Sequence, residues 1–294
     1  MNTLRTMADI VLHSRVAVAI ERLVLHKPHA VLLSGSQGGG KRTLAGHIAA
    51  RLLDLDDEHF ENYPYKMVLV PEQGTVLTIE QIRALQQTVS LKVPGKKSVA
   101  RIVMIMEAHM MSVEAQNALL KTLEEPPLDT IILMTTNRAD ALLPTIHSRV
   151  ATVHVLAPEP EQIEQWFLAK GHSREKIAQA SMVSGGLPGL MTALLTESTT
   201  HPLSAAIEQA RTILVRSSYE RLLLVDELSK QRQSIIDVLF VLTQMARTAL
   251  IRGAGQSADS ARWTRVLKAC YTAERQLSRN VQAKLVLTRL MLEL

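Results

Sequence analysis

The chain has 294 residues, of which 47% are apolar and only 3% aromatic, so we expect aliphatic, mostly helical cores in one large domain or two to three smaller ones. Its single cysteine, Cys270, excludes a disulfide framework and a cysteine-rich zinc site and fits a reducing compartment. The net charge of +5 is scattered along the chain, which favours an ordinary basic protein over attraction to nucleic acid or an acidic partner.

The N-terminal segment does not look like a targeting sequence. Residues 1–15 carry charges where a signal peptide needs an apolar segment. No apolar stretch approaches the roughly 18 residues that a membrane-spanning helix requires. The sequence therefore predicts a soluble, cytoplasmic protein without a membrane partner.

Strand-like and helix-like segments alternate over the first 157 residues. Short apolar runs predict strands at 30–35, 66–72, 100–107, 130–136 and 151–157. Helical spacing of apolar residues predicts helices at 41–55, 78–91 and 112–125. This alternation is typical of an α/β domain in which helices cover both faces of a parallel sheet.

The pattern becomes helical after residue 157. Helices are predicted at 159–170, 173–183 and 188–196, a polar linker follows at 196–204, and 203–294 shows only helical periodicity, with a loop at 252–260. We therefore divide the chain into 1–157, 158–200 and 201–294. Segments 222–228 and 235–246 have more apolar positions than one stripe needs, so a second face is covered either inside the domain or by a partner.

The segment "GSQGGGKR" at 35–42 follows a predicted strand, precedes a predicted helix and nearly matches a phosphate-binding loop. The glycines Gly35, Gly38, Gly39 and Gly40 would let backbone N–H groups surround phosphate oxygens, and Lys41 would reach the terminal phosphates. The alternative is a glycine-rich turn before a helix.

Two positions that hold Mg²⁺ in intact loops have changed. Arg42 stands where a hydroxyl is expected and Thr43 follows one residue late, while Met106 stands where a neighbouring strand normally ends in aspartate. A thioether is a poor ligand for a hard cation. Glu107 remains, but without a positioned metal we expect no hydrolysis; ATP or ADP binding is left open.

Segment 102–150 closely resembles the core of the bacterial DNA polymerase III clamp-loader subunits, which are AAA+ proteins. The resemblance rests mainly on the segments "AQNALLKTLEEPP" (115–127) and "LLPTIHSR" (142–149). In addition, 273–294 resembles the family's C-terminal collar helix. Nearly the whole chain is covered, most weakly at 1–25 and 200–260. Within the family the delta-prime subunits, the stators that do not hydrolyse ATP, are most similar, because the lysine and aspartate motifs are altered and Pro188 replaces an expected arginine.

The resemblance implies a RecA-like AAA+ domain, a small helical lid and an all-helical collar. It makes Arg149 an arginine finger that acts in a neighbouring subunit's ATP site, and it places Thr136 and Asn137 at the sensor 1 position. The alternative for Arg149 is a surface arginine paired with a carboxylate. Residues 53–70 lack the cysteines of the family's zinc module, so no zinc or other metal is expected.

By this resemblance the protein is a non-catalytic stator in a hetero-pentamer with motor and delta-like subunits, which loads a sliding clamp onto primer-template DNA. One rival function is an ATP-hydrolysing AAA+ motor, and another is a stand-alone DNA-binding protein. Several basic residues around 78–101 either lie near DNA phosphates or occupy a solvated face: Arg83, Lys92, Lys96, Lys97 and Arg101.

Overall fold

The computed structural model describes residues 10–71, 76–91, 93, 98–196, 203–252, 257–279 and 281–294. The chain divides into two compact units, Met1–Glu159 and Pro160–Leu294. The first boundary predicted from the sequence thus lies two residues before the observed one. The further division of 158–294 into lid and collar stays a prediction.

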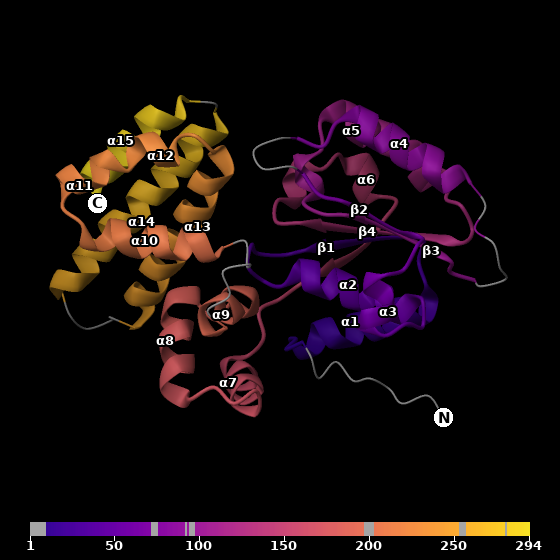
Figure 1. The fold of residues 1–294 in the computed structure, drawn as a ribbon, viewed down its shortest axis with the longest axis horizontal. Coiled ribbons are helices and arrows are strands. Elements are labelled where there is room, and N and C mark those ends of the chain that lie inside the picture. The colour runs from indigo at the N-terminus through magenta and orange to yellow at the C-terminus, as the bar shows by residue number, and fades with distance from the viewer. Residues whose placement is uncertain are drawn as a thin grey trace. The chain divides into compact units, whose positions relative to one another are not determined.

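The first unit is built on a five-stranded, all-parallel sheet (Figure 1). The strand order is β2-β3-β4-β1-β5, so the first strand lies between the last two. The strands are β1 (Ala30–Ser34), β2 (Lys66–Leu69), β3 (Arg101–Ile105), β4 (Thr130–Thr136) and β5 (Ala151–His154). All five predicted strands are confirmed, and β3 and β4 are buried throughout, as their unbroken apolar runs require.

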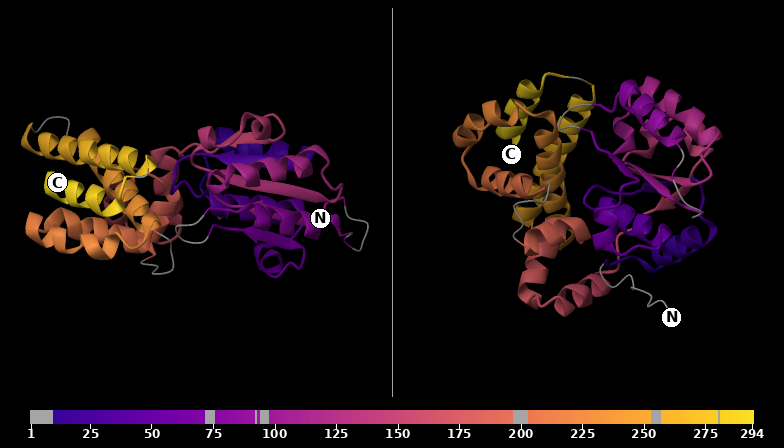
Figure 2. Two further views of the ribbon diagram at one scale, coloured as in Figure 1. Left: turned by 90° about the horizontal axis from the view of Figure 1, so that it is seen from above. Right: turned by 45° about the vertical axis from the view of Figure 1, so that its right-hand side comes forward.

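Helices cover both faces of this sheet (Figures 1 and 2). One face packs against α1 (Ser14–His26), α2 (Lys41–Leu52) and α3 (Asp57–Glu61), and the other against α4 (Ile79–Ser90), α5 (Val113–Glu124) and α6 (Pro144–His147). Side chains cap the start of two of these helices: Thr78 and Gln81 form a capping box before α4, and the Ser112 side chain accepts from the Ala115 N–H at α5.

The second unit is entirely helical within its described residues. Its helices are α7 (Pro160–Ala169), α8 (Arg174–Ser184), α9 (Pro188–Leu195), α10 (Ser204–Val215), α11 (Ser218–Leu223), α12 (Val225–Leu228), α13 (Arg232–Arg252), α14 (Ser257–Ser278) and α15 (Ala283–Glu293). One buried apolar cluster runs from Leu187 in the lid segment to Met291 in the collar segment and includes the fully buried Cys270. Lid and collar residues therefore share a core.

Several sequence expectations need correction. The helix α1 and the short helices α3 and α6 were not predicted, and the loop expected at 252–260 is too long because α14 begins at Ser257. Most of the expected linker at 196–204 lies outside the described residues. Ser234–Ile251 in α13 is long and apolar enough to cross a membrane by length and composition, contrary to our expectation. This helix also supplies the unit's core, with Val238, Leu239 and Leu242 buried.

Candidate functional site

The glycine loop lies at the carboxyl end of β1, between β4 and β5. The Gly35 N–H donates to the Thr136 carbonyl oxygen at 3.1 Å, and the Val155 N–H donates to the Ser34 oxygen at 2.7 Å. A Cβ added to Gly35 would approach the Val155 carbonyl oxygen to 2.6 Å, which explains the glycine. Gly40 caps α2 with a φ of 79°, a left-handed conformation that glycine adopts without strain. Strand, loop and helix therefore adopt the order typical of a phosphate-binding loop.

The Lys41 ammonium is bound by its own loop. Its Nζ donates to the Gly35 oxygen at 2.8 Å and to the Ser36 oxygen at 2.7 Å. Burial lowers the pKa of Lys41 to about 8, and the Glu107 charge opposes this shift. A phosphate group would have to compete with these two carbonyl oxygens for the ammonium.

The positions expected to hold Mg²⁺ do not fit that ion. Arg42, Thr43 and Met106 line one cavity of about 480 Å³, together with His47 and Lys66 among others. Met106 is 2% exposed, and its sulfur accepts from the Thr135 hydroxyl at 3.7 Å. A guanidinium and a thioether are not ligands for a hard cation, and the Glu61 carboxylate in the lining is paired with Lys66. Among the described residues no group of three or more His, Cys, Asp or Glu side chains could hold a metal, and the absence of zinc stays a prediction.

Glu107 lies directly after β3 in a left-handed conformation with a φ of 52°. Its N–H donates to the Thr135 hydroxyl at 3.0 Å. Although the side chain is exposed, the crowded site desolvates the carboxyl enough to raise its pKa, while the positive charges of Lys41 and Arg42 act in the opposite direction. The positive charges of Lys41 and Arg42 thus offset the negative charge of Glu107 within the same chain.

The sensor 1 position holds one buried and one exposed residue. Thr136 is fully buried; its hydroxyl accepts from the Arg138 N–H at 3.0 Å and lies 3.3 Å from His109 Nδ1. Burial, followed by the charges of Arg138 and Lys41, lowers the pKa of His109 to about 4, so the ring is neutral at pH 7. Thr136 thus connects the end of β4 to Arg138, in the segment that follows this strand, and to His109, whereas Asn137 is exposed. No motif in the sequence pointed to His109.

Arg149 lies at the amino-terminal ends of the strands, opposite the end that carries the glycine loop. It precedes β5, whose Ala151 pairs with Val31, so the register places Arg149 beside His29 at the start of β1. Gly35 is six residues further along β1, roughly 20 Å away at the usual rise per residue. Arg149 therefore cannot reach the loop of its own chain.

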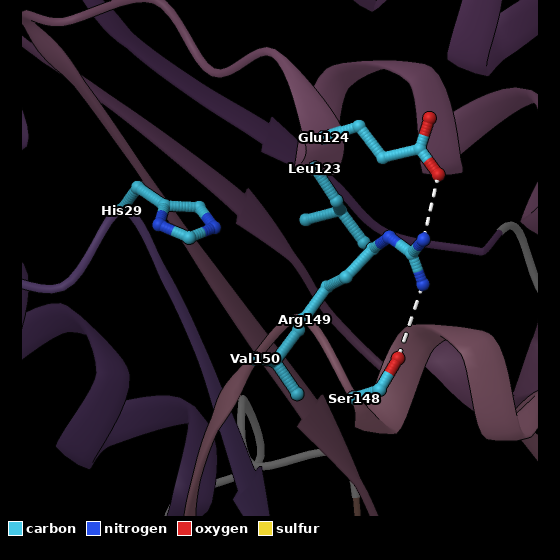
Figure 3. A pocket seen from close by; sticks show the side chains of 6 residues that line it. All are labelled: His29, Leu123, Glu124, Ser148, Arg149 and Val150. Atoms are coloured by element: carbon cyan, nitrogen blue, oxygen red, sulfur yellow. Dashed lines mark hydrogen bonds and ion pairs between the residues drawn. The ribbon is translucent and has the colours of Figure 1, made fainter.

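The Arg149 guanidinium is paired with a carboxylate, as one of the two sequence readings expected. Its Nη2 lies 2.8 Å from Glu124 Oε1, and its Nη1 donates to the Ser148 hydroxyl at 3.0 Å (Figure 3). Nη1 also donates to the Thr145 carbonyl oxygen at 3.0 Å. These side chains line a shallow cavity of about 620 Å³ with His29, Leu123 and Val150. Glu124, at the end of α5, is thus the carboxylate that pairs with Arg149.

Of the basic residues near 78–101, the structure describes Arg83 and Arg101. Arg101 is 4% exposed and donates to the Val89 and Leu91 carbonyl oxygens, so it is a structural residue. Arg83 is exposed on α4. Lys92, Lys96 and Lys97, like Asn280 in the collar segment, lie outside the described residues.

The β5-β1-β4-β3-β2 sheet and its glycine loop define an AAA+ protein fold. The protein-family model for the delta subunit of DNA polymerase III matches residues 24–159. Over this segment the chain is similar to the DNA polymerase III delta-prime subunits.

Two curated relatives support the assignment. The DNA polymerase III subunit delta-prime of Escherichia coli (strain K12) is 35% identical over 135 residues, which cover 45% of this chain and 40% of the relative. That of Pseudomonas aeruginosa is 33% identical over 180 residues, which cover 54% and 53%. The chain thus matches about half the length of these relatives.

A solved structure supports the fold over nearly the whole chain. A DNA polymerase III gamma subunit-related protein from Thermotoga maritima superposes with a TM-score of 0.59 at 18% identity, covering 95% of this chain and 98% of that one. At this identity the likeness concerns the fold alone.

The lowered pKa of Lys41 leads to a pH-dependent prediction. Below pH 8 Lys41 is protonated in both the folded and the unfolded chain, but between about 8 and its ordinary value of 10.5 only the unfolded chain keeps the proton. Raising the pH through this window therefore favours the folded state. We expect the free energy of unfolding to rise relative to that of Lys41→Met, measured by urea unfolding at each pH. Parallel pH profiles for the two proteins would contradict the burial of this ammonium.

Proposed function

We propose that this protein is a stator of a DNA polymerase III clamp loader, which does not hydrolyse ATP and supplies Arg149 to the ATP site of a neighbouring subunit. The observation that carries the proposal is the position of Arg149 at the amino-terminal ends of β1 and β5, opposite the glycine loop of its own chain. A guanidinium keeps its charge at all relevant pH values and can stabilise charge on a transferring phosphoryl group. From this position its guanidinium could contact an ATP only on another chain.

The loop supports the non-hydrolysing part of the proposal. Lys41 is bound to loop carbonyl oxygens, and Arg42 and Met106 occupy positions where phosphoryl transfer needs metal ligands. Glu107 alone would polarise water without a metal to align the phosphate. ATP or ADP held without turnover remains compatible with this loop.

The proposed partners follow from the delta-prime family. They are motor and delta-like subunits in a hetero-pentamer, the sliding clamp, and primer-template DNA reached through the complex, all in the cytoplasm. The second unit would carry assembly. It exposes large apolar side chains on α11 and α15, with Tyr219 73%, Leu223 64%, Leu285 61% and Leu292 60% accessible.

Assembly is tested by native mass spectrometry after co-purification with DNA polymerase III tau and delta subunits. Truncation near residue 200 is a poor test because Leu187 and Leu190 share a core with the collar segment. We expect Leu223→Ser combined with Leu285→Ser to remain folded yet lose most of the complex, because each substitution removes exposed apolar surface. The matched control is Val18→Ser with Leu25→Ser on α1, which are also exposed. Equal assembly by both double variants would contradict a collar interface.

A further inference from the structure

We infer that Glu124 is the positioning residue of Arg149: it holds the guanidinium in the free chain and gives it up to the phosphates of the neighbouring site. This inference rests on the proposed role of Arg149. It assigns to Glu124 a control over when that arginine becomes available.

The place of Glu124 in its helix is the first argument. It is the last residue of α5, where the helix dipole presents its negative end, so a carboxylate here is unfavourable without a cation nearby. Arg149 is that cation, with Nη2 2.8 Å from Oε1. Glu125, the next residue, is also exposed and acidic but has no such pairing with Arg149 among the described contacts.

The geometry of the arginine is the second argument. Three acceptors hold its guanidinium against its own unit: Glu124 and the Ser148 hydroxyl, both drawn in Figure 3, and the Thr145 carbonyl oxygen. Only Glu124 carries a charge, so it is the acceptor that competes most directly with a phosphate. Phosphate oxygens of a nucleotide on another chain would compete with this carboxylate for the guanidinium.

The strength of the pair suits such an exchange. The Arg149 side chain is 34% exposed and that of Glu124 51%, so water and salt weaken their attraction. An exposed ion pair of this kind shifts a population by about fivefold at most. A nucleoside triphosphate, with several negative oxygens, can therefore displace Glu124 from Arg149. Without such a ligand the Arg149–Glu124 pair persists.

The first test uses the isolated full chain. Phenylglyoxal modifies accessible arginines, and peptide mass spectrometry resolves its rate at Arg149. We expect Glu124→Gln to raise this rate by up to about fivefold at low salt, and the difference to vanish as salt screens the pair. Glu125→Gln, which removes the same charge from the same helix end, should leave the rate unchanged. Equal rates for wild type and Glu124→Gln would overturn the inference.

The second test uses the reconstituted complex and its ATP turnover. Glu124→Gln should lower the concentration of this chain that gives half-maximal turnover by up to about fivefold, with no effect on an Arg149→Ala background. If Arg149→Ala slows turnover but Glu124→Gln leaves the half-maximal concentration unchanged, the positioning role is wrong and the proposed function stands. If Arg149→Ala itself has no effect, the proposed function fails, and the role of Glu124 fails with it.

Discussion

Arg149→Ala is expected to slow ATP turnover of the reconstituted clamp loader while leaving this chain folded and assembled. An arginine finger contributes on the order of 10³-fold at its own site. The overall loss should be smaller because the remaining ATP sites keep their own arginines. The fold should tolerate the change, since the side chain is partly exposed and its carboxylate partner can be solvated.

The matched control is Arg15→Ala, which removes an exposed arginine from α1 of the same unit. It should leave turnover at the wild-type level. Native mass spectrometry of both variants separates lost catalysis from lost assembly. Equal turnover by Arg149→Ala and Arg15→Ala in intact complexes would show that the Glu124 pair is the whole role of Arg149.

Arg101→Met is expected to destabilise the first unit by about 3 kcal/mol. Arg101 Nη1 donates to the Val89 oxygen at 2.7 Å and Nη2 to the Leu91 oxygen at 2.6 Å, at the C-terminal end of α4. Hydrogen bonds from a charged donor contribute about 1.5–3 kcal/mol each, and the freed carbonyl oxygens would lose their partner. Methionine keeps an apolar stem in the buried space, so the loss of stability reflects the missing guanidinium.

Urea unfolding, monitored by hydrogen exchange of the β3 amides, measures this loss of stability. Arg83→Met, on the exposed side of α4, serves as the control and should change stability by less than about 0.5 kcal/mol. A stable Arg101→Met variant with weakened, salt-dependent DNA binding would instead restore the DNA-contact hypothesis for this residue.

The sheet was predictable from the sequence because its strands are short apolar runs that alternate with amphipathic helices. The misses have local causes. α3 and α6 have only five and four residues, too few to show helical periodicity. α14 begins at Ser257, inside a segment whose glycine, serine and aspartate residues suggested a loop. Strand order depends on contacts distant in the chain and was not predicted.

The glycine loop was predictable because its residues are adjacent in the chain. The pairing of Arg149 with Glu124 was not, because these residues meet only when β5 begins beside the end of α5. A carboxylate in the last turn of a helix was the available signal, since that position favours a nearby cation. The separation of Arg149 from its own loop also required the register of β1 and β5.

The central claim is that this chain acts through Arg149 and not through its own loop, and ATP turnover by complexes that carry Lys41→Ala tests it most directly. Lys41 is bound to the Gly35 and Ser36 oxygens, so we expect intact complexes with this variant to retain near-wild-type turnover, and the isolated wild-type chain to show none. If Lys41→Ala abolishes turnover in an intact complex, or if the isolated chain hydrolyses ATP with Mg²⁺ and loses this activity on Glu107→Gln, the chain is a motor and the account is wrong.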